Sequence, residues 1–220
     1  MRLLLTSGGV TNPSIHAAAE RLLGKPVADS HALVVPTAQW GHPWCGPASV
    51  QRLAAAGDGS PHLAGLGWAA VGVLELTALA SIGPQRWVPW VEAADVLLVD
   101  GGDATYLAHW VRASGLLDVV PSLDRTVWIG VSAGSMAMAP RVGDLFVEWS
   151  GAPDDRGLGL VDVAIFPHLD AFPTNTMAEA ERWAAGLGLP AYALDEQSAL
   201  AVVDGEVEVV SEGRWRRFDV

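Results

Sequence analysis

Short apolar runs along the chain alternate with stretches in which apolar residues recur every three or four positions. The runs predict buried strands, and the second pattern predicts helices. The predicted strands span residues 3–5, 31–36, 72–76, 95–100, 126–131 and 161–166. The predicted helices span residues 14–23, 48–56, 104–112, 116–123, 134–139 and 176–187. This alternation indicates an α/β fold, with a mostly parallel sheet covered by helices on both faces.

Two further strands are predicted near the C-terminus, over residues 199–203 and 206–210. Asp204-Gly205 separates them, and this dipeptide favours the tight turn of a β-hairpin. The hairpin would add antiparallel strands at one side of the sheet. Because the length fits one large domain and no linker stands out, we expect a single domain over residues 1–220.

Composition narrows the class of function. The formal net charge of −12 disfavours nucleic acid and anionic membrane surfaces as partners. No apolar run approaches the ~20 residues of a membrane helix, and the N-terminus lacks the pattern of a signal peptide. The chain has one cysteine, Cys45, so no internal disulfide can form and a cytoplasmic location is expected. No cluster has metal-ligand spacing and Gly8-Gly9 lacks the full dinucleotide-binding pattern, so we predict neither metal nor nucleotide cofactor.

The strongest chemical signal is a Gly-x-Ser-x-Gly motif at residues 130–134, between a predicted strand and a predicted helix. In this context the serine lies at the apex of a tight turn, with its hydroxyl exposed. The free N–H groups at the start of the helix would point toward an oxyanion beside it. Ser132 is therefore the candidate nucleophile.

A serine hydroxyl is a weak nucleophile unless a base, most often a histidine, removes its proton. His168 alone among six histidines directly follows a predicted strand, and sites of α/β sheets lie beyond the carboxyl ends of strands. The other histidines lie in predicted helices, at a strand start or in loops: His16, His31, His42, His62 and His109. Spacing leaves six carboxylates that could orient the imidazole: Asp144, Glu148, Asp162, Asp170, Asp195 and Glu196.

Two more segments contribute to the predicted site. Gly101-Gly102 follows the strand at residues 95–100, and a backbone N–H there could form an oxyanion hole with the N–H of Ala133. Thr6-Ser7-Gly8-Gly9 follows the first predicted strand and would lie at the same edge of the sheet. Tryptophans in the neighbouring loops suggest an apolar or aromatic pocket wall: Trp40, Trp44 and Trp149.

Six stretches together resemble a known family. In chain order they are Leu3-Leu4-Leu5-Thr6-Ser7-Gly8-Gly9, Ala32-Leu33-Val34-Val35-Pro36-Thr37-Ala38, Asp95-Val96-Leu97-Leu98-Val99-Asp100-Gly101-Gly102-Asp103-Ala104-Thr105, Gly130-Val131-Ser132-Ala133-Gly134-Ser135, Pro167-His168 and Leu194-Asp195-Glu196-Gln197-Ser198-Ala199-Leu200. In this order and spacing the chain resembles the S51 serine peptidases, which include peptidase E, an aspartyl dipeptidase, and cyanophycinase. The similarity covers nearly the whole chain.

The resemblance implies the flavodoxin-like fold of class I glutamine amidotransferases, with serine in place of their elbow cysteine. It implies a triad in the order Ser, His, Glu, which places Ser132 as nucleophile, His168 as base and Glu196 as its orienting acid. The oxyanion donors would be the N–H groups of Gly102 and Ala133. An α/β-hydrolase order would instead make Asp144, Glu148 or Asp162 the acid, with Asp144 the best alternative.

The sequence departs from the family pattern around the histidine. Phe166 stands where many members have Asn or Asp. Counting from His168 places Arg182 at the position of the arginine that binds an acidic substrate side chain, whereas aligning the helix places Glu179 there. Arg182 and Asp103 are candidate substrate-binding residues.

The resulting prediction is a serine peptidase that hydrolyses small peptides through an acyl-enzyme. The alternatives are a serine esterase or amidase with the same catalytic parts, and a non-catalytic protein that binds a small molecule on this fold.

Overall fold

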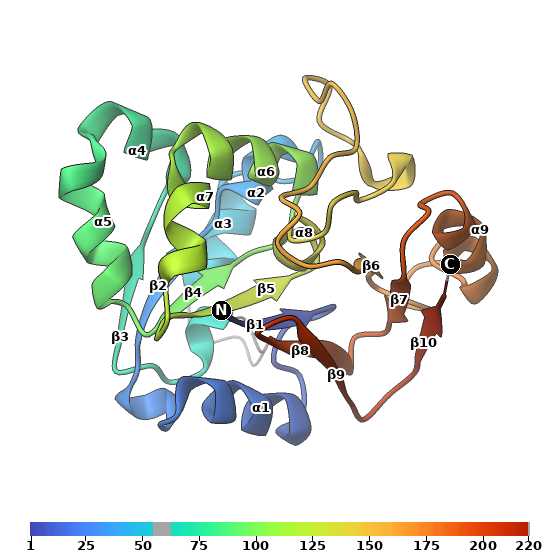
Figure 1. Cartoon of the computed structure of the whole chain (residues 1–220), viewed down its shortest axis with the longest axis horizontal. Helices are drawn as coiled ribbons and strands as arrows, with labels where there is room; N and C mark the ends of the chain where they lie inside the picture. The colour runs from blue at the N-terminus through green and yellow to red at the C-terminus, as the bar shows by residue number, and fades with distance from the viewer. Residues whose placement is uncertain (55–62, 220) are drawn as a thin grey trace.

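The computed structural model describes residues 1–54 and 63–219, which form a central sheet with helices on both faces and a smaller sheet beside it (Figure 1). The strands are β1 (Arg2–Thr6), β2 (His31–Val35), β3 (Ala70–Val73), β4 (Val96–Val99), β5 (Val127–Val131), β6 (Ala164–Phe166), β7 (Ala191–Leu194), β8 (Ser198–Val203), β9 (Glu206–Ser211) and β10 (Trp215–Phe218). The α-helices are α1 (Pro13–Leu23), α2 (Ala38–Gly41), α3 (Pro47–Ala54), α4 (Leu76–Ile82), α5 (Pro84–Ala93), α6 (Ala104–Ala113), α7 (Leu116–Val119), α8 (Ala133–Met136) and α9 (Met177–Ala185).

The central sheet has the strand order β3-β2-β4-β5-β1-β8-β9. The first five strands in this order run parallel, while β8 pairs antiparallel with both β1 and β9. The predicted hairpin therefore lies where the sequence indicates, closed by Asp204-Gly205. The prediction of a mostly parallel α/β sheet with a C-terminal hairpin is confirmed.

The two faces of the sheet carry separate hydrophobic cores, because successive residues of a strand point to opposite sides. Leu3 and Leu5 of β1 pack with residues of α4, α5 and α6, whereas Leu4 packs with Ile15 and Leu22 of α1. All three leucines of β1 have no exposed surface. Figure 1 shows α1 below the sheet and α4 to α7 above it. Strands buried on both faces explain why the sequence shows continuous apolar runs.

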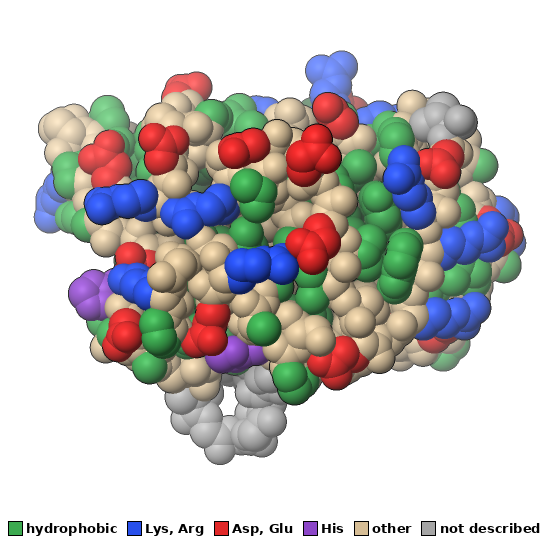
Figure 2. All heavy atoms as spheres, turned by 60° about the horizontal axis from the view of Figure 1, so that its bottom comes forward, with side chains coloured by type: hydrophobic (Ala, Val, Ile, Leu, Met, Phe, Trp, Pro, Cys, Tyr) green, Lys and Arg blue, Asp and Glu red, His purple; other side chains and the backbone are tan. Residues whose placement is uncertain are grey.

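On the face covered by α1, acidic and basic side chains are interspersed (Figure 2). Arg21 of α1 pairs with Glu208 of β9 at 2.6 Å, and Lys25 pairs with Asp95 at 2.7 Å. The negative charge of the chain is thus mixed with cations on this face.

The main correction concerns the predicted strand at residues 161–166. The strand is shorter, Ala164–Phe166, and it belongs to a second sheet of order β10-β7-β6. Its core is built from β6, β7 and α9, with Phe166 fully buried against Trp183. His168 thus follows a strand of this small sheet, beside the edge of the main one.

Several other boundaries differ from the prediction. β3 begins at Ala70, and Leu76 starts helix α4 where a strand end was expected. Helix α5 was not predicted, because Pro89 in its interior obscures the buried pair Trp87 and Val91. The last two residues of the helix predicted over 48–56 lie outside the described residues. The expectation of a single domain over the whole chain remains a prediction.

Candidate active site

Strand β5 ends at Val131, and the next residue, Ser132, has φ 49° and ψ −112°. Residues other than glycine rarely adopt a positive φ, so the backbone of Ser132 is held in a strained conformation. The flanking glycines are needed for the turn. A Cβ on Gly130 would lie 2.4 Å from the carbonyl oxygen of Gly134, and one on Gly134 would lie 2.2 Å from the carbonyl oxygen of Val99. Helix α8 begins at the next residue, Ala133.

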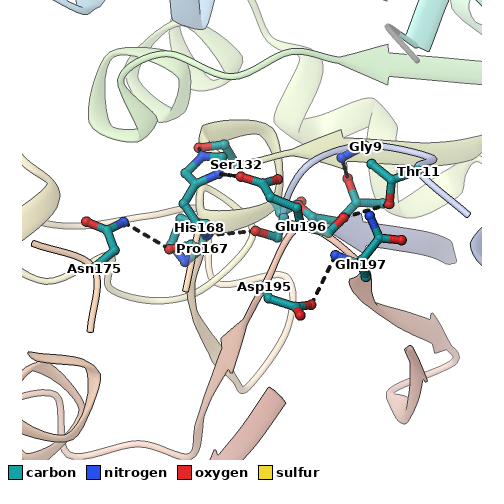
Figure 3. Close-up of polar contacts among 12 residues, drawn as sticks. Gly9, Thr11, Ser132, Pro167, His168, Asn175, Asp195, Glu196 and Gln197 are labelled. Atoms are coloured by element: carbon teal, nitrogen blue, oxygen red, sulfur yellow. Dashed lines mark hydrogen bonds and ion pairs between the residues drawn. The ribbon is translucent and has the colours of Figure 1, made fainter. Parts of the chain in front are cut away.

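Ser132, His168 and Glu196 lie in one line of hydrogen bonds (Figure 3). The Oγ of Ser132 is 2.8 Å from the Nε2 of His168, and the Nδ1 of His168 is 2.6 Å from Oε1 of Glu196. The side chains of His168 and Glu196 are 24% and 39% exposed, so the group opens to solvent at one side. The structure thus brings together the serine, the histidine and one of the six candidate carboxylates.

The end of β1 contacts all three of these residues. The N–H of Ser132 donates to the carbonyl oxygens of Thr6 and Ser7, at 3.1 and 3.2 Å. The Oγ of Ser7 accepts a hydrogen bond from the N–H of His168 at 2.7 Å. A Cβ on Gly8 would lie 1.8 Å from Oε2 of Glu196, so glycine leaves the space that this carboxylate occupies.

The turn between β7 and β8 positions Glu196. The hydroxyl of Thr11 donates to the carbonyl oxygen of Glu196 at 2.6 Å. Next to it, the carboxylate of Asp195 accepts from the N–H of Gln197 at 3.0 Å and from the hydroxyl of Ser198 at 2.6 Å. Figure 3 shows Asp195 and Glu196 pointing to different sides of this turn. Asp195 therefore stabilises the turn, and its neighbour reaches the imidazole.

The loop after β4 lies directly against Ser132. A Cβ on Gly101 would be 3.4 Å from the Cβ of Ser132. Gly102 has φ 134°, and a Cβ there would lie 2.2 Å from the carbonyl oxygen of Ala38. Only glycine fits this second position, because both its backbone conformation and the space around it exclude a side chain.

Asp103 lies one residue further and is 1% exposed. Its Oδ1 accepts from the hydroxyl of Thr105 at 2.6 Å and from the N–H of Tyr106 at 2.7 Å, so it caps the N-terminus of α6. Its Oδ2 accepts from the N–H groups of Glu148 and Trp149, at 2.9 and 2.8 Å. Four donors fill this carboxylate, so the geometry favours an anchoring role over the predicted contact with substrate.

The structure does not bring Arg182 to the serine. Its side chain is 67% exposed and pairs with Glu179 on the same helix, α9. Both line a hollow that contains none of Ser132, His168 and Glu196; Asp144, the alternative acid of the triad, lies there too and is exposed.

The remaining candidates also have other neighbours. Glu148 pairs with His42 at 2.8 Å, and Asp170 pairs with Arg214 at 2.7 Å. Asp162 is exposed. His62 lies outside the described residues.

Sequence reasoning missed Phe172, which packs edge-on against the imidazole of His168 with 5.7 Å between the ring centroids. Its side chain is 56% exposed, so an apolar surface lies beside the histidine. The residue stands in a loop without periodicity, and only the position of the loop reveals it. Of the predicted pocket-wall tryptophans, Trp44 is 86% exposed and Trp40 46% exposed, while Trp149 lines a separate hollow along α6.

Within residues 1–54 and 63–219, no group of three or more His, Cys, Asp or Glu side chains is arranged to hold a metal ion. In the same part of the chain, no helix has the length and apolar character needed to cross a membrane. The cytoplasmic location stays a prediction, as do the absence of a cofactor and of nucleic-acid or membrane partners.

Comparison with known proteins identifies the fold and the family of the chain. The chain is similar to the structure of a protein assigned as a peptidase E from Listeria monocytogenes EGD-e, with 17% identity, a TM-score of 0.68 and coverage of 96% of this chain and 98% of the other. It is also similar to a peptidase from an acI-B1 Actinobacterium, with 19% identity, a TM-score of 0.67 and coverage of 99% and 93%. No curated protein sequence matches. The sequence model of peptidase family S51 matches residues 3–210. The chain therefore belongs to peptidase family S51 and is a serine-type peptidase.

Proposed function

We propose that this peptidase hydrolyses small peptides through a triad of Ser132, His168 and Glu196. The observation that supports this most is the pair of hydrogen bonds that joins the serine hydroxyl to the imidazole, at 2.8 Å, and the imidazole to the carboxylate, at 2.6 Å. Both distances lie within the range at which a proton can pass between a nucleophile and its base.

The carboxylate determines the tautomer of the imidazole. A proton on Nδ1 of His168 is donated to Glu196, which leaves the lone pair of Nε2 to accept the hydroxyl hydrogen of Ser132. When the imidazole takes the proton of the hydroxyl, the carboxylate stabilises the resulting cation. Glu196 is therefore an orienting acid and does not itself become protonated.

Acylation then follows from the positions of these groups. The Oγ of Ser132 attacks the peptide carbonyl while Nε2 of His168 takes its proton. The N–H groups of Gly102 and Ala133 donate to the oxyanion of the tetrahedral intermediate. His168 returns the proton to the departing amine, and the acyl-enzyme remains. A water molecule, deprotonated by the same nitrogen, attacks the acyl group, and His168 then returns this proton to the Oγ of Ser132 as the acid product leaves.

Selection of an acidic substrate side chain by Arg182 has no support in this geometry. The guanidinium pairs with Glu179 and lies away from the three residues. The apolar surface next to the imidazole is Phe172. We propose that the substrates are short peptides chosen without an arginine contact to an acidic side chain.

The test incubates the protein, its Ser132→Ala variant and its Glu196→Gln variant with a library of short peptides, and follows product masses. Cleavage by the parent, loss in Ser132→Ala and strong reduction in Glu196→Gln are expected. A labelling experiment with an acylating probe runs beside it. If the probe labels Ser132 but no peptide is cleaved, the protein is a serine hydrolase of another class. If neither occurs, the catalytic proposal is wrong.

A further inference from the structure

A hollow of about 540 Å³ lies along α6, outside the group formed by Ser132, His168 and Glu196. One wall comes from a face of α6 and the other from the segment after residue 148: Thr105, His109, Arg112, Ala113, Trp149, Pro153, Asp154 and Arg156. Protein sites for small molecules commonly have volumes of about 300–1,000 Å³. The hollow is therefore of a size that suits a small ligand.

The charges in this hollow favour an anion. Arg112 donates to the carbonyl oxygens of Ala108 and Gly157, and no carboxylate pairs with it among residues 1–54 and 63–219. Arg156 is neutralised by Asp154 at 3.1 Å. One uncompensated positive charge thus lies in the hollow of a chain whose formal net charge is −12. A guanidinium held by carbonyl oxygens keeps N–H groups free for a carboxylate.

The apolar wall of the hollow is already in place. The indole of Trp149 lies 5.2 Å from the rings of both Tyr106 and His109, measured between centroids. A Cβ on Gly151 would lie within 2.6 Å of this indole, so the chain packs closely against it. The N–H of Trp149 is held by Asp103 at 2.8 Å. A wall fixed before binding lowers the entropic cost of ordering side chains around a ligand.

We propose that this hollow binds a monoanionic carboxylate that carries a flat apolar group. The carboxylate lies against Arg112 and the flat group packs on Trp149. One net positive charge matches one carboxylate, whereas a phosphate dianion would be left partly uncompensated. A free aromatic acid and the C-terminal residue of a peptide share this chemistry.

The site also adjoins the loop that carries Gly102. Thr105 and Trp149 line the hollow, and both donate hydrogen bonds to Asp103. A ligand in the hollow would therefore contact Thr105 and Trp149, which hydrogen-bond to Asp103, the residue after Gly102. The inference does not depend on the proposed triad, because its test measures binding.

The experiment titrates the full chain with N-acetylphenylalanine by calorimetry, beside its neutral amide and N-acetylalanine. We expect the aromatic acid to bind at least tenfold more tightly than either comparison compound, because each lacks one of the two matched groups. Arg112→Gln is expected to weaken binding of the acid at least tenfold. Arg86→Gln is the matched control, because Arg86 also lies beside a tryptophan, Trp90, with 5.9 Å from guanidinium to ring centroid.

Two further measurements keep the result unambiguous. Trp149→Leu tests the apolar wall if Arg112→Gln proves unstable in a thermal melt. Glycylphenylalanine tests whether a peptide C-terminus occupies the same site, which is shown by its competition with the free acid. Equal binding of acid and amide, equal binding by folded Arg112→Gln and the parent, or no binding at millimolar concentration would each overturn the inference.

Discussion

Gly8 is the position at which a single added methyl group tests the triad most directly. The residue is not in the left-handed region of φ, so alanine is compatible with its backbone. The added Cβ would lie 1.8 Å from Oε2 of Glu196, 2.9 Å from its Cδ and 3.2 Å from its Cβ. The end of a flexible side chain can move away at low cost, and here that end is the carboxylate that contacts the imidazole. Gly8→Ala should therefore affect catalysis much more than stability.

The displacement can be worked out from these distances. A Cβ contact shorter than 3.0 Å is essentially never found, so Oε2 must move by at least about 1.2 Å. If the whole carboxylate moves by that amount away from His168, along the line of their hydrogen bond, the 2.6 Å distance from Oε1 to Nδ1 of His168 lengthens to about 3.8 Å. This exceeds the limit of a hydrogen bond. Loss of the orienting carboxylate costs serine hydrolases roughly 10⁴ in turnover, and a displaced carboxylate is expected to cost the same or less.

The assay measures kcat/KM on a peptide that the parent cleaves, together with thermal unfolding. We expect Gly8→Ala to lose about 10²–10⁴ of kcat/KM while its melting temperature changes by less than about 3 °C. The matched control is Gly65→Ala, because within residues 1–54 and 63–219, its two chain neighbours aside, no heavy atom lies within 4 Å of the Cβ that it adds. The control should retain the activity of the parent.

A double variant shows whether the effect passes through Glu196. If Gly8→Ala acts by displacing that carboxylate, then Gly8→Ala with Glu196→Gln is no worse than the poorer single variant. Losses that multiply would mean that the methyl group damages the site by another route. Activity of Gly8→Ala within threefold of the parent would refute the assignment of Glu196 as the orienting acid.

Three further predictions address the base, its anchor and the pH dependence of stability. In the proposed mechanism His168 returns its proton to the leaving amine, so we expect the substrate residue after the scissile bond to lie beside Phe172. Phe172→Ala should lower kcat/KM about fivefold to tenfold for peptides with an apolar residue there, and leave the hydrolysis of activated esters unchanged. Ser7→Ala removes the hydroxyl that accepts the N–H of the base, so kcat should fall about tenfold with little change in KM. Burial raises the pKa of the Asp95 carboxyl, but the N–H of His31 and the ammonium of Lys25 outweigh it, so the pKa is lowered below its ordinary 3.8. Because the pKa of Asp95 is lower in the folded than in the unfolded state, its ionised carboxylate stabilises the fold at pH values above the unfolded-state pKa. This stabilisation is lost as the pH falls through the folded-state pKa. The difference in melting temperature between the parent and Asp95→Asn should thus be constant above pH ~5 and should shrink toward zero as the pH falls below ~4.

The elements that the sequence predicts well are those whose burial leaves a regular pattern. Strands β4 and β5 lie inside the sheet with helices on both faces, so nearly every residue is apolar and the runs are unmistakable. Strands β7 and β10 were missed, since they belong to a small sheet against one helix. β10 has the sequence Trp-Arg-Arg-Phe and is mostly exposed, so no apolar run marks it. Patterning thus detects the strands of the main sheet, and of the small sheet it detects β6 alone, with a start three residues too early.

The candidate site divides in the same way. Ser132 can be predicted from the sequence because its turn requires the flanking glycines Gly130 and Gly134. The choice of Glu196 among six carboxylates depended on family resemblance, since proximity across 28 residues from His168 has no local signal. The role of Arg182 in substrate binding stays a prediction, because a count of residues does not show where a helix puts its side chain, and here that side chain pairs with Glu179.

The two residues proposed as nucleophile and base have strained backbones, and both are held by hydrogen bonds to Ser7. Ser132 and His168 are two of the four described residues other than glycine with positive φ, at 49° and 57°. Such conformations cost on the order of 1–3 kcal/mol each and persist only where the surroundings determine them. Here both backbones donate hydrogen bonds to Ser7, through its carbonyl oxygen and its hydroxyl. Ser7, the residue directly after β1, thus joins the nucleophile on the main sheet to the base on the small sheet.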